Sequence, residues 1–169
     1  MALSDGDYIS CQSKVVEALL ADTGSGGLRE TGAEPVKTIE AELRSEPRAY
    51  RDHEVPAIAV CILSKEDRHE GTTTLKVFRL GFFIYCRGLD LEAEVATCQK
   101  IAHRLEVVLD DENLPGKQFG SLPSLIEGAQ GALTSEVRRT EFLQGGQVER
   151  GQKTYGVMGL VESDISIPT

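Results

Sequence analysis

The chain has 169 residues, of which 40% are hydrophobic and 27% charged, and its formal net charge is -9. This length suits one domain, residues 1–169, with a real core, and is short for two. The negative charge disfavours nucleic acid as the main ligand, because phosphate binding needs clustered Lys and Arg. No apolar run approaches the ~20 residues that span a bilayer, so no membrane partner is expected.

A first amphipathic helix is predicted near the N-terminus. Ser4 or Asp5 can cap it, and it is expected to end at Asp22 or Thr23. Apolar residues recur there at intervals of three and four, which is the helical period. They are Tyr8, Cys11, Val15, Val16, Leu19 and Leu20. Residues 23–35 follow, rich in glycine and polar side chains, and are expected to form a flexible loop.

Three strands are predicted in the next part of the chain. Val36–Leu43 is expected to be a short strand with Val36 or Ile39 facing inward. Pro56 precedes the apolar run Ala57–Leu63, which has the composition of a buried central strand.

The third of these strands is predicted to be long. A polar turn is expected at Ser64–Gly71, and the strand then runs over Thr72–Cys86, where aromatic and β-branched residues dominate. Gly81 inside it indicates a bulge or a close approach of neighbouring atoms.

A second amphipathic helix follows the break at Arg87-Gly88. Asp90 is placed to cap it, and the acidic run that begins at Asp110 is expected to end it, because the macrodipole disfavours negative charge at a helix C-terminus. Its apolar stripe fits a helix that lies across a sheet. The stripe consists of Leu91, Val95, Cys98, Ala102, Leu105, Val108 and Leu109.

The C-terminal part is predicted to be a flexible loop, residues 113–131, followed by two strands. The loop carries apolar side chains that either pack on the chain's own sheet or dock on a neighbouring subunit. The strands Ala132–Leu143 and Lys153–Ile167 are expected to be joined by a polar hairpin tip, Gln144–Gln152. Alternation in the last strand predicts one core face and one face that becomes polar toward the C-terminus.

No residue pattern predicts catalysis, a cofactor or a metal. The four cysteines are irregularly spaced without a ligand-spaced histidine, so buried free thiols are expected. Gly24-Ser25-Gly26-Gly27 lacks the spacing of a nucleotide-binding loop. The three histidines form no pattern with a Ser or Cys nucleophile. We therefore name no catalytic residue and expect a protein that is not an enzyme.

Local basic clusters stand out in this acidic chain. They contain Arg44, Arg48, Arg51, Arg138 and Arg139. One interpretation is a solvated or salt-bridged surface, the usual state of surface charges. The other is subunit recognition, in which acidic helix residues of an adjacent copy, such as Glu92, Glu94 and Glu106, meet these arginines.

The order of elements resembles the tail terminator, or tail completion, proteins of long-tailed bacteriophages. The resemblance lies in the capped N-terminal helix, the variable loop, the strands VPAIAVCIL and RLGFFIYCRG, the helix LEAEVATCQKIAHRLEVVL, and the closing strands GALTSEVRRTEFLQ and KTYGVMGLVESDI. It spans nearly the whole chain. It is a resemblance of arrangement more than of signature residues.

The resemblance implies an α+β fold, a small sandwich of a mostly antiparallel sheet with two main amphipathic helices packed on it. It also implies a hexameric ring that caps the tail tube, ends tube polymerisation and presents the surface for head joining. The expected partners are further copies of the chain, the tail tube protein and a head-completion or neck protein, with DNA only passing through the lumen. The expected location is the virion, in the tail or neck, after assembly in the host cytoplasm.

Candidate interface residues follow from the basic clusters and the long loop. They are Arg48, Arg51, Phe119, Leu122, Leu125, Arg138 and Arg139. Alternative functions are another neck component such as a head-completion or stopper protein, a minor tail protein, or a component of a tail-derived injection machine. A small cytosolic enzyme or ligand-binding domain is the alternative of a different class, and it would need an enclosed pocket.

Overall fold

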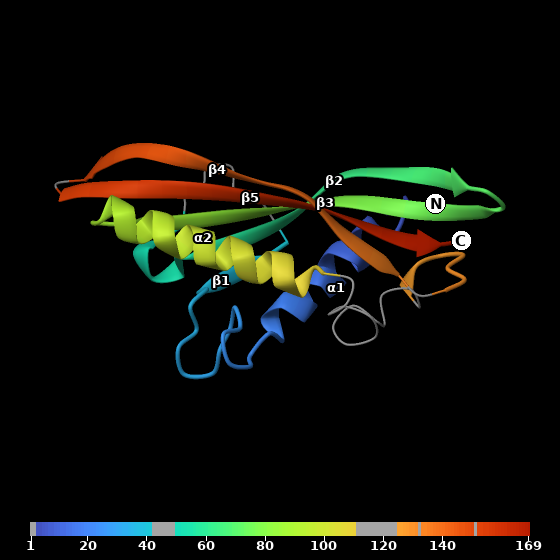
Figure 1. The fold of residues 1–169 in the computed structure, drawn as a ribbon, viewed down its shortest axis with the longest axis horizontal. Coiled ribbons are helices and arrows are strands. Elements are labelled where there is room, and N and C mark those ends of the chain that lie inside the picture. Colours follow the sequence, from blue (N-terminus) through green and yellow to red (C-terminus); the bar gives the residue numbers. More distant parts are fainter. Residues whose placement is uncertain (1–2, 42–49, 111–124, 132, 151) are drawn as a thin grey trace.

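A computed structural model of the chain describes residues 3–41, 50–110, 125–131, 133–150 and 152–169. Its elements are α1 (Tyr8–Leu20), β1 (Thr38–Glu40), a short 3-10 helix (Asp52–Glu54), β2 (Ala57–Glu70), β3 (Thr73–Gly88), α2 (Leu91–Val108), β4 (Thr134–Arg150) and β5 (Gln152–Pro168). Figure 1 shows them as a long, twisted sheet with both helices on one side.

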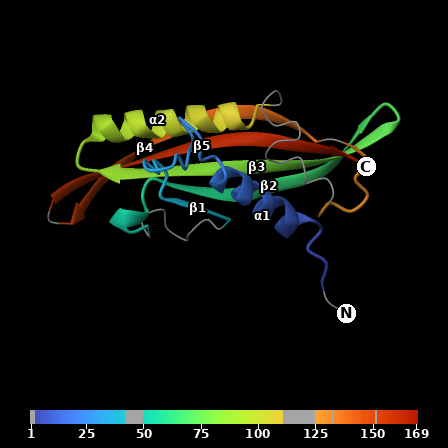
Figure 2. The same ribbon diagram turned by 90° about the horizontal axis from the view of Figure 1, so that it is seen from below.

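The five strands form one sheet in the order β1-β2-β3-β5-β4. Every neighbouring pair is antiparallel except β1 and β2, which pair in parallel over three residues. Figure 2 shows α1 lying over the β1–β2 side of this sheet and α2 over the β4–β5 side. The predicted α+β fold, a mostly antiparallel sheet with two packed helices, is confirmed.

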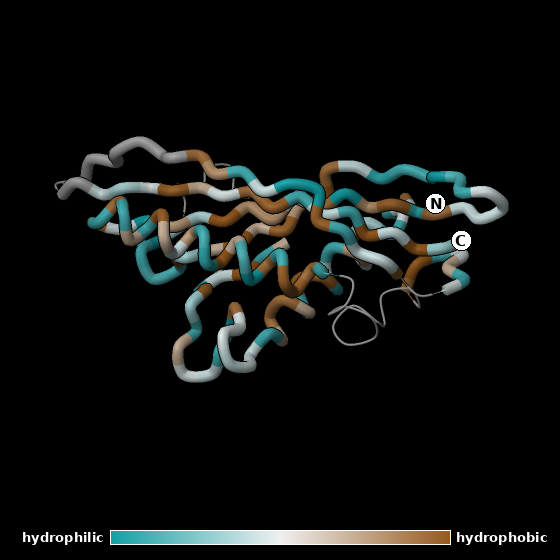
Figure 3. The backbone as a smooth tube through the Cα atoms, in the orientation of Figure 1, coloured by the Kyte–Doolittle hydropathy of each residue, from teal (hydrophilic) through white to brown (hydrophobic). Residues whose placement is uncertain are grey.

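The core lies between the helices and one face of the sheet. Alternate residues of β3, from Phe78 to Cys86, are fully buried on this face. Cys98 and Leu105 of α2 and Val15 and Leu19 of α1 close the same hydrophobic cluster from above. Figure 3 shows hydrophobic residues along the middle of the strands, whereas the outer half of β2 is hydrophilic.

Both predicted helices are confirmed, with shifted ends for the first. α1 begins at Tyr8 with Asp7 at the N-cap position and no side-chain cap bond from it, so the predicted cap at Ser4 or Asp5 is wrong. The Asp5 carboxylate still accepts a hydrogen bond from the Ile9 N–H (3.0 Å). It ends at Leu20, two residues before the predicted end. Asp90 caps α2 as expected, accepting hydrogen bonds from the N–H groups of Glu92 and Ala93.

Two predicted turns are wrong. Ser64–Glu70 continues β2, paired with β3 as far as Thr73, and only Gly71 and Thr72 form the turn. Residues 144–150 and 152 likewise extend the β4–β5 ladder rather than forming a long tip. Both stretches are polar, so they lack the hydrophobic alternation that indicates a strand, and the partner strand supplies the hydrogen bonds that hold them extended.

The predictions about Gly81, Val36, Ile39 and the thiols are confirmed. Gly81 lies opposite a register shift in β2, and the methyl groups of Leu63 pack closely over it. Val36 and Ile39 are both buried. All four cysteines are free, three of them buried and Cys61 half-buried.

A partly buried ion pair ties the segment after α1 to α2. The Asp22 carboxylate accepts hydrogen bonds from Nε (2.9 Å) and Nη2 (2.6 Å) of Arg104 and from the Leu28 N–H (2.8 Å). Burial alone would raise the pKa of Asp22, but these hydrogen bonds and the Arg104 charge outweigh it and lower the pKa. Within residues 23–35, Leu28 is buried in the hydrophobic core and attaches this segment to it. The flexibility of the segment stays a prediction.

Gly159 of β5 sets how closely α2 approaches the sheet. A Cβ atom at this position would lie 3.0 Å from Cys98 Sγ and 3.3 Å from the Phe142 ring. We expect Gly159→Val to lower the free energy of unfolding by about 1–3 kcal/mol, because the new methyl groups overpack this contact. Urea unfolding at neutral pH measures the effect. Gly24→Val is the matched control, since nothing lies within 4 Å of a Cβ there, and an equal loss in both variants would contradict this explanation.

Candidate functional site: the open face of the sheet

The sheet face turned away from both helices carries the candidate site, which we call the open face. Side chains alternate along β5, so Glu162 and Asp164 point away from the core that Val161, Ser163 and Ile165 enter. Within the described residues, neither helix packs on this side, and only residues 50–55 cover one end of it. There the Tyr50 ring stacks on Tyr85 with ring centroids 6.0 Å apart.

An apolar row crosses the open face beside the Tyr50 contact. Leu160 of β5 lies opposite Phe83 on one side, and Met158 lies opposite Leu143 of β4 on the other. Leu143 is 61% exposed and Leu63, at the β2 bulge, is 43% exposed, whereas Phe83, Met158 and Leu160 are half-buried. A contiguous apolar area of this kind on a protein surface marks a contact site more often than isolated exposed residues do.

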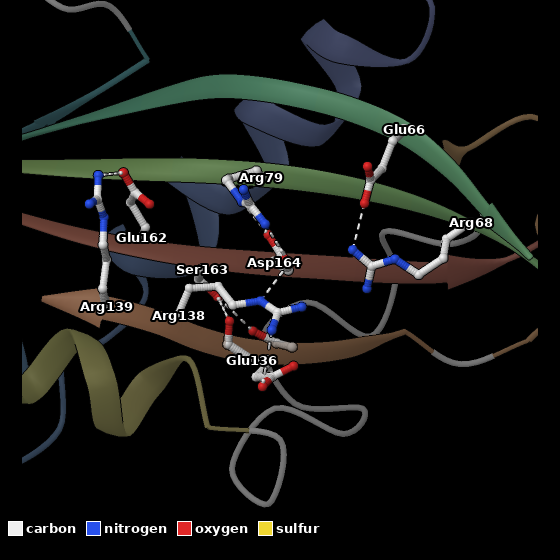
Figure 4. A network of polar contacts seen from close by, with 10 residues as sticks. Glu66, Arg68, Arg79, Glu136, Arg138, Arg139, Glu162, Ser163 and Asp164 are labelled. Atoms are coloured by element: carbon white, nitrogen blue, oxygen red, sulfur yellow. Dashed lines mark hydrogen bonds and ion pairs between the residues drawn. The ribbon is translucent and has the colours of Figure 1, made fainter. Parts of the chain in front are cut away.

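A charged cluster continues the open face toward the C-terminal end of β5, and Figure 4 shows its centre. The Asp164 carboxylate accepts hydrogen bonds from Nε of Arg79 (2.9 Å) and from Nε of Arg138 (2.7 Å). Its side chain is only 2% exposed, whereas the side chains of Arg79 and Arg138 are 40% and 35% exposed. The carboxylate therefore lies beneath two guanidinium groups that face solvent.

Arg139 repeats this arrangement one step along the sheet. Its Nη2 contacts Glu162 Oε1 and its Nη1 contacts Glu141 Oε1, both at 2.9 Å. Glu162 is 13% exposed and Arg139 is 54% exposed, so the guanidinium again lies outside the carboxylate. The three arginines line a shallow hollow of about 670 Å³ together with Leu63, Ser64 and Glu162.

The hollow does not have the make-up of a small-molecule pocket. Its volume falls in the usual range for such pockets, but five of its six lining residues are polar and it is open to solvent. Small-molecule sites are concave and mostly apolar, with few polar groups. An apolar row beside exposed arginines has the composition of a protein–protein interface, in which Arg is enriched and an apolar centre meets a polar rim.

The predicted interface residues fall into three groups. Arg138 and Arg139 lie on the open face, and their ion pairs fit the salt-bridged interpretation of this cluster. Arg51 is exposed near the Tyr50 end, and Leu125 is 50% exposed on the segment before β4. Arg48, Phe119 and Leu122 lie outside the described residues. Whether any of them forms an interface stays a prediction.

The three helix glutamates differ in availability. Glu92 is exposed at the first turn of α2. Glu94 is half-buried, and burial together with the charge of Asp90 raises its pKa. Glu106 accepts a hydrogen bond from Thr140 Oγ1 of its own chain (2.6 Å). Glu92 is therefore the one best placed to meet a partner.

Sequence reasoning missed most of the apolar row and the carboxylates under the arginines. Phe83, Met158 and Leu160 belong to strands that were correctly predicted, but which of their faces the helices cover depends on the tertiary fold. Alternation in β5 was the available signal, because it placed Met158, Leu160, Glu162 and Asp164 on one face.

The chemical groups described here do not form a metal-binding cluster. Among the described residues, no group of three or more His, Cys, Asp or Glu side chains is placed to hold a metal ion. In the same part of the chain, no helix is long and apolar enough to cross a membrane.

We expect Asp164→Asn to lower the free energy of unfolding at pH 7 by about 1–3 kcal/mol. This loss is smaller than that expected on removing one charge of a fully buried ion pair, because Arg79 and Arg138 are partly exposed. Burial alone would raise the Asp164 pKa, but the hydrogen bonds from Arg79 and Arg138 outweigh it and lower the pKa. The stabilisation is therefore complete above the unfolded pKa of about 3.9 and is lost as pH falls through the lower folded value.

Urea unfolding at neutral pH and near pH 3 checks this prediction. The gap in stability between the wild type and Asp164→Asn should narrow in acid. Asp67→Asn, an exposed carboxylate on β2, is the control and should change stability by less than about 0.5 kcal/mol. A gap that is constant with pH would contradict the assigned role of the Asp164 charge.

No protein-family model matches the sequence. No curated protein matches it either. Among solved structures, the chain is similar to one from a structure described as the virion of a native gene transfer agent (GTA) particle. The likeness has a TM-score of 0.49 with 13% sequence identity, and it covers 96% of this chain and 99% of that one.

Proposed function

We propose that this chain is a structural virion protein of the tail terminator class. Six copies form a ring that caps the phage tail tube, ends tube polymerisation and presents the surface to which the head is joined. The partners are other copies of the chain, the tail tube protein and a head-completion or neck protein. DNA passes through the lumen, and no catalytic step or cofactor is involved.

The observation that carries this proposal is that the chain has two different broad faces. One side presents the outer surface of α2, and the other is the open face with its apolar row and arginines. A ring is built by a head-to-tail contact, in which two different patches of each subunit meet. A two-layer fold with unlike sides supplies such patches, whereas a fold covered on both sides of its sheet would bury them.

The charge of the chain agrees with a ring around DNA. The formal net charge is -9, and most exposed arginines described above are paired with carboxylates of their own chain. A lumen with net negative charge repels phosphate and lets DNA slide, because attraction to phosphates would retain it. The same charge keeps free subunits soluble before they assemble.

Light scattering and negative-stain imaging of the purified protein, with and without assembled tail tubes, test the proposal. We expect rings of six copies and caps at one end of the tubes, and tubes that stop growing when the protein is added. A compact monomer that never decorates tube ends would contradict the proposal. Rings that bind a head-completion protein but ignore tubes would instead favour another neck component.

Leu143→Glu connects this test to the open face. Burying a leucine contributes about 1.5–3 kcal/mol, so the variant should weaken ring assembly by roughly tenfold to a hundredfold. Ile9→Glu is the matched control, because Ile9 is 65% exposed on α1 and Leu143 is 61% exposed. If rings of Leu143→Glu are as stable as wild-type rings, the apolar row is not part of the ring interface.

A further inference from the structure

The sheet has two long edges that lack a partner strand in the described part of the chain. β4 is the last strand in the order β1-β2-β3-β5-β4, and among the described residues it pairs only with β5. On the opposite edge, β1 pairs with β2 over Ala57–Ala59, and the described residues give 64–70 of β2 no partner except β3. An unpaired edge presents backbone N–H and C=O groups to which a further strand can hydrogen-bond.

The outer edge of β4 lacks the usual protection against such pairing. Proteins protect long edges with proline, lysine or bulges. β4 contains neither proline nor lysine, and Arg139–Gln144 pair regularly with β5 between its two register shifts. Within this stretch Phe142 and Leu143 are 42% and 61% exposed, and they lie on opposite faces of the sheet. An apolar edge of this kind pairs with other chains unless something covers it.

The free edge of β2 begins with matching apolar side chains. Ile62 packs against the core cluster on the helix side of the sheet. Leu63 is 43% exposed and lines the hollow on the open face. The lysine of this edge, Lys65, turns toward α1, where its Nζ donates a hydrogen bond to the Gly6 carbonyl (2.7 Å). Its charge is therefore held away from the edge and does not protect it.

The strand directions allow these two edges to meet in a head-to-tail contact. β2 and β5 run in one direction and β3 and β4 in the other, because each neighbouring pair among these four strands is antiparallel. A second copy, related by rotation about an axis along the strands, therefore presents its β2 antiparallel to β4 with its helices on the same side. Pairing β4 with β4 is isologous instead, and it stops at two copies.

We propose that β4 of one copy pairs antiparallel with β2 of the next copy, so that the sheet continues from one subunit to the next. This inference rests on the proposed ring and names the contact between its subunits. Backbone hydrogen bonds supply affinity, as they do when a peptide adds a strand to the edge of a sheet. The contact joins two different edges, so it can repeat around a closed ring.

The faces of the side chains select the register of this pairing. Opposite residues of an antiparallel pair lie on the same face of the sheet. Phe142 and Ile62 both lie on the helix side, so they are placed opposite each other. With Leu63 as the bulged residue of β2, Glu141 then lies opposite Ser64 on the open face.

This register also brings the exposed leucines of the two edges together. Leu143 of one copy lies beside Leu63 of the next, and burying them against each other adds apolar contact to the backbone hydrogen bonds. Further along, Arg139 lies opposite Glu66, so the pairing places no like charges against each other there. The ion pairs at this exposed seam contribute little, and the register depends on the apolar residues.

Engineered disulfides test the contact and its register. Ser64 and Glu141 are exposed, and within one copy β3 and β5 separate their strands by about 14 Å, at ~4.8 Å per strand. Cysteines at these positions can be linked only between copies, because a disulfide needs Cα atoms about 4.4–6.8 Å apart. We expect Ser64→Cys/Glu141→Cys, in a Cys61→Ser background, to form crosslinked chains of up to six copies on mild oxidation with diamide.

The matched control is Ser64→Cys with Glu136→Cys in the same background. Glu136 is also an exposed residue of β4, but it lies about 15 Å along the strand from Glu141, so the control should give few crosslinks. Non-reducing gels measure the crosslinks, and thermal unfolding confirms that each variant is folded.

Hydrogen exchange of the wild-type protein gives a readout that needs no substitution. The outward-pointing backbone amides of Arg139–Gln144 and Ser64–Glu70 should exchange at least about tenfold more slowly in rings than in protein diluted to monomers. The amides of β5 are the internal reference, because β5 has a partner strand on both sides, and their exchange should change little.

The outcomes separate this inference from the proposed function. Wild-type rings that cap tubes would overturn the edge contact, and leave the function standing, if amide exchange at both edges is unchanged or the folded double variant crosslinks no better than its control. Crosslinked chains of more than six copies that never cap tubes would keep the edge contact and overturn the ring. A wild type that stays monomeric and never caps tubes would overturn both.

Discussion

The structure depends on one constraint, which is that two helices cover only one face of a five-strand sheet. Both helices deliver their apolar stripes to the same hydrophobic cluster, which alternate residues of β3 and β5 complete. The other set of alternate residues is left without a helix layer in the described part of the chain. An antiparallel sheet tolerates this, because such sheets commonly have one solvated face.

The open face is neither uniformly polar nor uniformly apolar, and this sets its chemistry. Residues at one end contribute the apolar row around Leu160, and residues at the other end contribute arginines above Asp164 and Glu162. Placing the carboxylates underneath stabilises the arginines in fixed positions while their outer edges stay available. The result is a preorganised surface, and preorganisation lowers the cost of association.

Much of the fold could be predicted from periodicity alone. The stripe of α2, its Asp90 cap and the alternation of β5 each have a strong local signal, and each is confirmed. The outer half of β2 could not be predicted in this way, because SKEDRHE is charged on both faces and is held extended by its pairing with β3. The hydrophobic pattern of a segment does not predict a strand where pairing with the neighbouring strand, and not burial, determines its conformation.

The candidate site was predictable only in part. Arg138 and Arg139 were found because two adjacent arginines are conspicuous in an acidic chain, but the carboxylates beneath them, Asp164 and Glu162, lie on β5, more than twenty residues away. Leu63 was assigned to a buried strand, and its exposure follows from the β2 register shift beside Gly81. Such features depend on strand register, which the sequence pattern leaves open at a bulge.

Hydroxyl-radical footprinting tests most directly whether the open face is buried on assembly. It would compare oxidation of Leu63 and Leu143 in protein diluted to monomers with oxidation in rings bound to tail tubes, using Ile9 on α1 as the internal reference. A several-fold fall at Leu63 and Leu143 relative to Ile9 is the predicted result. Equal oxidation of the two leucines in both states would contradict the assignment of the open face as the assembly surface.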